Sequence, residues 1–223
     1  ASIESNVKRI VALSSDKAAA PINLYGATKL CSDKLFLAAN NSKDKKEIKI
    51  CVVRYGNVMG SRGSVIPYFI QQAKQGTITI TDPGMTRFNI SLKQTIEMVL
   101  WALNNSLGGE LFVPKIPSYK ITDLAEAIGP SCKKEIKGIR PGEKIHEEMI
   151  TNADSLNTID LKKYYAILPT DGKLKKEYMD SKLNFKDVES NFSYNSGNNK
   201  SFLNIEQIRK LIIENVDKKF KPI

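Results

Sequence analysis

The stretch that determines the expected fold is "SSDKAAAPINLYGATK", residues 14–29. The apolar run "VKRIVALS" (7–14) precedes it and is typical of a buried strand, whereas "KLCSDKLFLAAN" (29–40) has apolar residues at helical spacing. Asp16 and Lys17 therefore lie between the end of a strand and the beginning of a helix. In open α/β sheets this position faces the ligand crevice.

The rest of the chain repeats this alternation of strands and helices, which predicts an α/β fold with a parallel sheet. No GxGxxG segment occurs in the sequence, although a dinucleotide-binding sheet normally begins with a strand, such a turn and a helix. We expect strands at 7–14, 48–55, 77–81, 110–114 and 134–139, and helices at 24–39, 65–75, 92–105, 122–128 and 205–216.

Composition narrows the class of protein. The 223 residues are 41% hydrophobic and 26% charged, and no run of about 18 apolar residues suggests a membrane span. Cys31, Cys51 and Cys132 are far apart and form no CxxC pair, which favours a reducing compartment, the cytoplasm. The net charge of +10 comes from scattered lysines, so we expect no nucleic acid partner, while an anionic small substrate is compatible.

Tyr25 and Lys29 lie four residues apart in the expected helix and share one face. A tyrosine with a pKa of about 10 is a poor base at neutral pH, and a nearby ammonium group favours the phenolate. Ser15, at the end of the preceding strand, can hydrogen-bond the same reacting oxygen. Tyr-x-x-x-Lys also arises by chance, so the alternative is a buried tyrosine beside an exposed lysine.

Five segments together resemble a known family. "ALSSDKAAAPINLYGATKL" (12–30) is similar to the active-site segment of the extended short-chain dehydrogenase/reductases. Within that family it resembles the inverting UDP-N-acetylglucosamine 4,6-dehydratases of the pseudaminic acid pathway. The resemblance runs from about Ser5 to Pro169 and continues, in the same order, in "VVRYGNVMGSRGSVIPYF", "MTRFNISL", "GGELFVPKIPS" and "GIRPGEKIHE".

The resemblance implies an NADP-dependent reaction on a UDP-sugar, serving flagellin or surface glycosylation. Tyr25 would deprotonate the hydroxyl on carbon 4 of the sugar, Lys29 would bind the nicotinamide ribose and tune Tyr25, and Ser15 would polarise the substrate oxygen. Elimination of water across carbons 5 and 6 needs a base and an acid. We assign Lys17 as the base and Asp16 as the acid. The alternative is a solvated turn in which Asp16 caps the following helix.

The same resemblance implies a binding site. The backbone of Val58 would approach the nicotinamide, and His146 is expected to be structural. No set of residues has metal-ligand spacing, so we expect no metal. Arg87 and Arg140 would clamp the diphosphate, and the alternative is that they are surface charges or members of structural ion pairs. The expected substrate-binding residues are Asn57, Val65, Thr81, Arg87 and Arg140.

The chain resembles the C-terminal two-thirds of such an enzyme. We expect a partial Rossmann-type domain at 1–114, with substrate-domain segments interleaved near 64–91, and a smaller substrate-binding α/β part at 115–223. A homo-oligomer is also expected. The alternative is a non-catalytic remnant that binds a nucleotide-sugar or a partner protein. A reading frame that continues upstream into a strand–GxGxxG–helix unit would favour the enzyme.

The missing glycine-rich turn leads to a first prediction. The 223-residue chain is expected to bind NADP+ only weakly, because a pyrophosphate is normally held by that turn and the helix N-terminus after it. Calorimetric titration of the purified chain measures this, and micromolar binding with one cofactor per chain would contradict the prediction.

Overall fold

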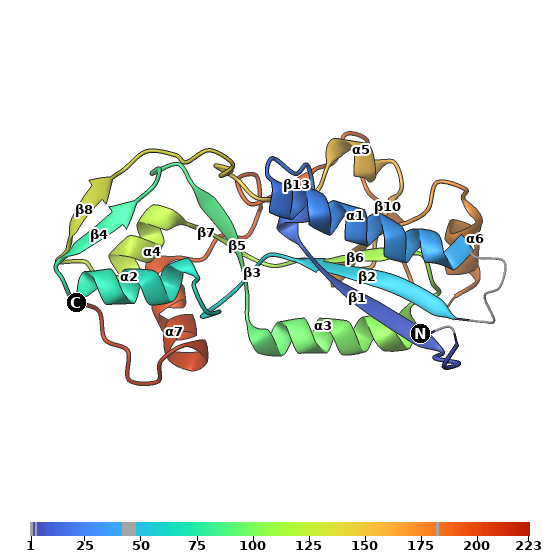
Figure 1. The fold of residues 1–223 in the computed structure, drawn as a ribbon, viewed down its shortest axis with the longest axis horizontal. Helices are drawn as coiled ribbons and strands as arrows, with labels where there is room; N and C mark the ends of the chain where they lie inside the picture. Colours follow the sequence, from blue (N-terminus) through green and yellow to red (C-terminus); the bar gives the residue numbers. More distant parts are fainter. Residues whose placement is uncertain (1, 3, 42–47, 182) are drawn as a thin grey trace. The chain divides into compact units, whose positions relative to one another are not determined.

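The computed structural model describes residues 2, 4–41, 48–181 and 183–223. The chain folds as two compact units. Figure 1 shows the ribbon with colours that follow the residue numbers. Unit 1 comprises Ala1–Tyr55, Ile96–Lys115 and Glu148–Tyr194, and unit 2 comprises Gly56–Thr95, Ile116–Glu147 and Asn195–Ile223. The expected domains were 1–114, with interleaved segments near 64–91, and 115–223, whereas each unit is assembled from three separate stretches of chain.

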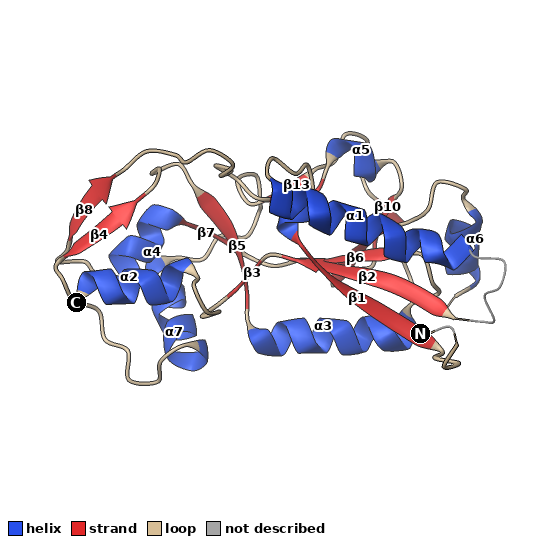
Figure 2. Cartoon of the chain, viewed as in Figure 1, coloured by secondary structure: helices blue, strands red, loops and turns tan. Residues whose placement is uncertain are grey.

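Unit 1 contains a six-stranded sheet with the order β1-β2-β6-β11-β10-β12. Its parallel part consists of β1 (Arg9–Ser15), β2 (Lys49–Tyr55) and β6 (Leu111–Pro114), as the red arrows of Figure 2 show. The expected α/β class with a parallel sheet is confirmed. Three antiparallel strands extend this sheet: β11 (Tyr164–Ile167), β10 (Thr158–Asp160) and β12 (Lys186–Asp187).

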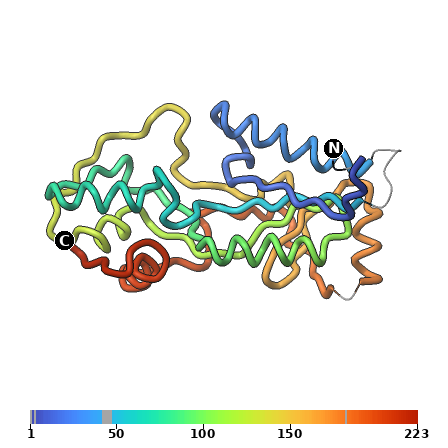
Figure 3. The backbone as a smooth tube through the Cα atoms, turned by 60° about the horizontal axis from the view of Figure 1, so that its bottom comes forward, coloured from blue at the N-terminus to red at the C-terminus, as the bar shows by residue number. Residues whose placement is uncertain are grey.

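Two helices cover opposite faces of the parallel strands, α1 (Leu24–Ala38) on one face and α3 (Leu92–Asn105) on the other (Figures 1 and 3). From Ile96 onward α3 belongs to unit 1. It buries Met98 and Ala102 against the sheet, and Trp101 packs edge-on against Phe112 with ring centroids 5.2 Å apart. This face therefore holds the apolar core of unit 1.

Helix α1 is attached to the sheet in a different way. The structure describes every residue of α1, and its buried residues are Gly26 and Asp33, whereas Leu24 and Leu35 are exposed. Nη2 of Arg54, on β2, lies 3.0 Å from Oδ2 of Asp33, and the side chains are 4% and 3% exposed. Because a buried charge without a partner is very costly, this ion pair holds α1 against β2.

A second buried carboxylate organises the far end of the unit. Glu110 accepts hydrogen bonds from the backbone N–H groups of Leu107 and Gly108 and from the hydroxyl of Tyr178 on α6 (Lys173–Asp180). Burial raises the pKa of the Glu110 carboxyl despite these donors. Gly109 reverses the chain after α3 with φ of 108°, a conformation that favours glycine.

Unit 2 packs helices against small sheets. β4 (Thr77–Ile80) pairs in parallel with β8 (Lys133–Ile136), and a second sheet has the order β3 (Asn57–Val58), β5 (Thr86–Ile90), β7 (Ser118–Lys120). The core joins apolar residues of β4 to three helices: α2 (Val65–Ala73), α4 (Ile121–Ile128) and α7 (Ile205–Asn215). All three helices were expected from the sequence.

Several short elements were not predicted. The sequences of β5 and β7 mix apolar and polar residues without clear alternation. β10, β11 and α6 lie in a stretch that is rich in lysine and asparagine. Their formation depends on pairing partners distant in sequence, such as β6 for β11. The remaining short elements are 3-10 turns at Asp16–Ala18 and Ala39–Asn41, α5 (Asn152–Ser155), β9 (Glu148–Ile150) and β13 (Tyr194–Asn195).

Within the described ranges of the chain, no helix has both the length and the apolar character needed to cross a membrane.

The Asp33–Arg54 pair yields a stability prediction. Asp33→Ala is expected to lower the free energy of unfolding of unit 1 by about 3–5 kcal/mol, because Arg54 would stay buried without its counter-charge. Urea unfolding monitored by circular dichroism measures the change. Asp187→Ala is the matched control, since Asp187 pairs with Lys175 at the surface, where both side chains are at least 38% exposed. Equal losses in the two variants would contradict the prediction.

Candidate active site

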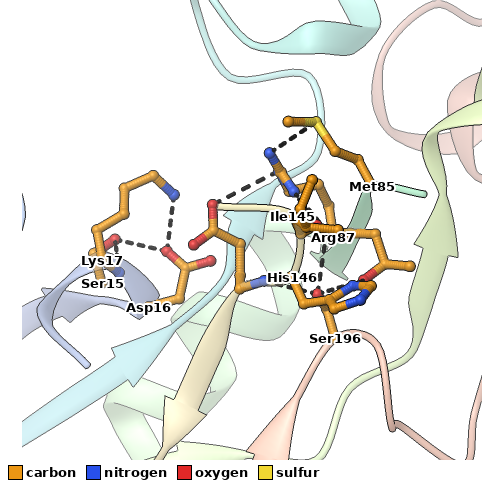
Figure 4. Close-up of polar contacts among 10 residues, drawn as sticks. Ser15, Asp16, Lys17, Met85, Arg87, Ile145, His146 and Ser196 are labelled. Carbon is orange, nitrogen blue, oxygen red and sulfur yellow. Dashed lines mark hydrogen bonds and ion pairs between the residues drawn. The ribbon is translucent and has the colours of Figure 1, made fainter. Parts of the chain in front are cut away.

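The Ser15–Asp16–Lys17 turn directly follows β1 and forms a hydrogen-bonded group in unit 1 (Figure 4). The Ser15 hydroxyl donates to Oδ1 of Asp16 at 2.9 Å, and Nζ of Lys17 lies 2.9 Å from the same oxygen. Asp16 is 1% exposed, and among the described residues its Oδ2 has no hydrogen-bond partner. The structure therefore brings together the three residues that the sequence predicts for polarising and proton-transfer roles.

The local fold explains this arrangement. The backbone N–H of Lys17 donates to the Ser15 hydroxyl, so Ser15 begins the 3-10 turn. Helix α1 begins after Asn23, which accepts a hydrogen bond from the backbone N–H of Gly26 at 2.8 Å. A Cβ atom at Gly26 would lie 2.3 Å from the Lys17 carbonyl oxygen. Only glycine permits this approach, which holds the beginning of α1 against the Asp16–Lys17 turn.

Tyr25 and Lys29 lie in the first turns of α1, one turn apart. The Tyr25 side chain is 54% exposed, so the alternative of a buried tyrosine at this position does not hold. Burial raises the pKa of the Tyr55 hydroxyl at the end of β2, and the nearby Tyr25 adds to the shift. The phenol of Tyr25 is thus accessible to a ligand at the carboxyl end of the parallel strands.

A cavity of about 500 Å³ lies within unit 2. Its wall contains all five residues that the sequence predicts for substrate binding, drawn from β3, α2, β5 and the segments after β4 and β8. They are Asn57, Val65, Thr81, Arg87 and Arg140. Val58, expected near the cofactor, follows Asn57 in β3 and is not among the residues that line this cavity. The shared location is a finding of the structure, whereas the roles of these residues stay predictions.

Two buried polar atoms belong to residues of this wall and make no hydrogen bond to the described residues. Oδ1 of Asn57 and Oγ of Ser64 are buried, and neither has a hydrogen-bond partner among the described residues. Ser64 precedes α2 without capping it through its side chain. Since buried polar groups are nearly always hydrogen-bonded, such atoms at a cavity wall indicate a place for a polar ligand or water.

Arg87, a residue of the cavity wall, is held by several polar contacts, which Figure 4 draws. Its Nη1 donates to the carbonyl oxygens of Thr86 at 2.7 Å and Ile145 at 3.0 Å, and its Nε lies 3.6 Å from Glu147. Arg140 is exposed at the cavity rim, where its backbone N–H donates to Glu143. The guanidinium of Arg87 is therefore oriented in advance, whereas the exposed side chain of Arg140 has room to follow a ligand.

Sequence reasoning missed the other residues of this wall, among them the polar residues Tyr68, Thr79 and Lys137. The alternation in "TITIT" carries the signal for Thr79, because Ile78 and Ile80 are buried and Thr79 shares the side of Thr81. Tyr68 and Lys137 had no comparable signal in the sequence.

His146, expected to be structural, anchors a loop of unit 2. Its Nδ1 lies 2.8 Å from the Thr86 hydroxyl, which also lies 2.7 Å from the hydroxyl of Ser196. A Cβ atom at Gly197 would lie 2.7 Å from the imidazole ring, so the loop packs directly on His146. These contacts connect the segment after Asn195 to β5.

Comparison with known proteins identifies the family. A family model described as "Polysaccharide biosynthesis protein" matches residues 1–169. The chain is 48% identical over 219 residues to the UDP-N-acetylglucosamine 4,6-dehydratase (inverting) of Campylobacter jejuni subsp. jejuni serotype O:23/36 (strain 81-176). It is 39% identical over 221 residues to the UDP-glucose 4-epimerase of Rickettsia canadensis (strain McKiel). The chain belongs to this polysaccharide biosynthesis family.

These matches cover the chain more fully than they cover the relatives. The two alignments include 95% and 96% of this chain but 65% and 63% of the relatives' lengths. The X-ray structure of Pen from Bacillus thuringiensis matches with a TM-score of 0.84 and 36% identity, covering 96% of this chain and 64% of that one. DesIV, a dTDP-glucose 4,6-dehydratase from Streptomyces venezuelae, shares only the fold, with 18% identity, a TM-score of 0.55 and coverage of 65% of this chain and 52% of its own.

The cations of the cavity lead to a binding prediction. Arg87→Ala is expected to weaken binding of inorganic pyrophosphate to the chain by about tenfold, because a charge-assisted hydrogen bond to an oriented guanidinium is lost. Isothermal titration calorimetry measures the affinity. Lys93→Ala removes the same charge at an exposed position of unit 2 and serves as the control. Equal affinities in the two variants would contradict a role for Arg87 in binding this anion.

Proposed function

We propose that this chain is the catalytic and substrate-binding part of an NADP-dependent dehydratase. At the full length of its relatives, the protein would convert UDP-N-acetylglucosamine to a 4-keto-6-deoxy sugar with inversion at carbon 5. The observation that supports this most is the unit 2 cavity, whose wall contains the five predicted substrate residues, two of them arginines. The 48% identity to an inverting UDP-N-acetylglucosamine 4,6-dehydratase supports the same substrate.

The first step is oxidation at carbon 4 of the sugar. Tyr25 removes the proton of the hydroxyl, and Lys29, one turn along α1, favours the phenolate through its positive charge. Ser15 polarises the same sugar oxygen by donating a hydrogen bond to it. To do so its hydroxyl proton must leave Oδ1 of Asp16, to which it donates in this structure. Substrate binding and the hydrogen bond of Asp16 are therefore coupled through Ser15.

The second step is loss of water across carbons 5 and 6. It needs a neutral amine on Lys17 and a protonated carboxyl on Asp16. Transfer of one proton from Nζ of Lys17 to Asp16, across their 2.9 Å contact, converts the ion pair into this acid and base with no change in total charge. Lys17 then accepts the proton of carbon 5, and Asp16 donates its proton to the departing hydroxyl.

The nicotinamide cofactor would be held from this chain by Tyr25, Lys29 and Val58. The half-exposed phenol of Tyr25 and the ammonium of Lys29 have the donor chemistry that suits a ribose hydroxyl. The sequence contains no GxGxxG turn for the pyrophosphate, so these residues account for only part of such a site. A bound nicotinamide would supply the hydride acceptor for carbon 4 and the hydride donor for carbon 6.

Other functions fit less well. An epimerase at carbon 4 needs no acid and base for elimination, whereas the Asp16–Lys17 pair supplies both, and this favours dehydration over the activity named for the Rickettsia relatives. A non-catalytic sugar-binding remnant would need the cavity but not the Ser15–Asp16–Lys17 group.

We propose that the product enters nucleotide-sugar synthesis for pseudaminic acid and surface glycosylation. We also propose that the enzyme acts in the cytoplasm as a homo-oligomer.

The stereochemistry of the product tests the proposal. Because Lys17 need not return its proton to the same face of carbon 5, we predict a product inverted there, with the L configuration. Proton–proton couplings in NMR spectra of the first-formed product, recorded before slow epimerisation, measure this. A first-formed product with the D configuration would contradict the proposal.

Two variants test the oxidation and the elimination separately. Tyr25→Phe is expected to abolish ketone formation at carbon 4 and to leave UDP-sugar binding nearly unchanged, since the phenol does not serve the diphosphate. Lys17→Glu is expected to reduce elimination sharply while oxidation at carbon 4 persists. Unchanged elimination in Lys17→Glu would place the base elsewhere.

A further inference from the structure

Gln72 in helix α2 connects two hydroxyl groups in the wall of the unit 2 cavity. Its Oε1 accepts a hydrogen bond from the backbone N–H of Thr79 on β4 at 3.0 Å. Its Nε2 donates to the Tyr68 hydroxyl at 3.0 Å and to the Thr79 hydroxyl at 3.0 Å. Tyr68 and Thr79 line the cavity, whereas Gln72 is not among the lining residues.

The direction of these bonds follows from chemistry alone. A backbone N–H can only donate, so the amide atom facing the backbone nitrogen of Thr79 must be the oxygen of Gln72. The other amide atom is then the NH₂ group, which also can only donate. Both hydroxyls are therefore acceptors in these bonds, and the proton of each hydroxyl is not used by Gln72.

The two hydroxyls can thus donate into the cavity. Tyr68 is 47% exposed and lines the cavity, so its side chain is accessible to a ligand. The positive charges of the wall, on Arg87, Lys137 and Arg140, come from β5 and the segment after β8 rather than from α2. A diphosphate suits these cations, which leaves the donors of Tyr68 and Thr79 for a neutral acceptor.

We propose that the Tyr68 and Thr79 hydroxyls, oriented by Gln72, select the nucleobase by donating to the carbonyl on carbon 4 of uracil. This inference rests on the proposed function, in which the cavity binds a UDP-sugar. Cytosine carries an amino group on carbon 4, which would face two donors and leave them unpaired. A site built to hydrogen-bond one group discriminates strongly against an analogue that lacks it. Gln72 acts as a positioning residue.

An isosteric substitution, Gln72→Glu, inverts this polarity. The carboxylate of the variant still accepts from the backbone N–H of Thr79 but offers no donor. The hydroxyls of Tyr68 and Thr79 would then donate to that carboxylate and would present lone pairs to the cavity. Such a wall suits an amino group and disfavours a carbonyl.

The experiment compares the binding of UDP and CDP by isothermal titration calorimetry to three forms of the 223-residue chain: the unchanged chain, Gln72→Glu and Gln71→Glu. UDP and CDP carry the same phosphate charge, so the ratio of their affinities cancels the repulsion from an added carboxylate. Gln71 is exposed on the same helix and is the matched control. We expect the unchanged chain and Gln71→Glu to prefer UDP, and Gln72→Glu to lower the UDP-to-CDP affinity ratio by about tenfold.

The outcomes separate this inference from the proposed function. UDP binding with the same affinity ratio in Gln72→Glu and Gln71→Glu overturns the inference and leaves the proposed function intact, whereas absence of UDP binding to the unchanged chain overturns both. If Gln72→Glu fails to fold, Tyr68→Phe and Thr79→Val provide the test. Each is expected to weaken UDP binding more than CDP binding, and equal losses for the two nucleotides overturn the inference.

Discussion

The buried ion pair between Asp33 and Arg54 is the interaction on which the candidate active site depends. Helix α1 carries Tyr25 and Lys29, yet it contributes few apolar side chains to the core, and Leu24 and Leu35 are exposed. Its position is set in the first turn by the close approach of Gly26 to the Lys17 carbonyl, and further along the helix by the 3.0 Å contact of Asp33 with Arg54. A buried ion pair is directional, so it holds the helix in one orientation as well as against the sheet.

The Ser15–Asp16–Lys17 turn holds a hydroxyl, a carboxylate and an ammonium group in hydrogen-bonding contact. Asp16 is buried, and one of its oxygens receives both the Ser15 hydroxyl and the Lys17 ammonium. A ligand that accepts a hydrogen bond from the Ser15 hydroxyl must therefore change the hydrogen bonding of Asp16. In the proposed reaction this connects the oxidation at carbon 4 to the elimination that follows, because Ser15 serves the first step and is hydrogen-bonded to Asp16, which serves the second.

The cavity of unit 2 combines side chains held in place by hydrogen bonds with an exposed side chain. Arg87 is fixed by two carbonyl oxygens and by Glu147, and Gln72 fixes the hydroxyls of Tyr68 and Thr79. Arg140 is exposed by comparison. Groups oriented before binding lose little entropy when a ligand arrives, so the fixed groups suit recognition, and the exposed arginine suits closure over a bound anion.

The sequence by itself determined the α/β class, the principal helices and the Ser15–Asp16–Lys17 and Tyr25–Lys29 groups, because these depend on local periodicity and on residues close together in the chain. Only the tertiary structure decided that β10 and β11 extend the sheet of unit 1, since short polar strands form where a partner strand already exists. It likewise decided the donor polarity of Tyr68 and Thr79. Hydrogen-bond direction there depends on Gln72 meeting one particular backbone N–H across two elements, and no spacing in the sequence encodes that meeting.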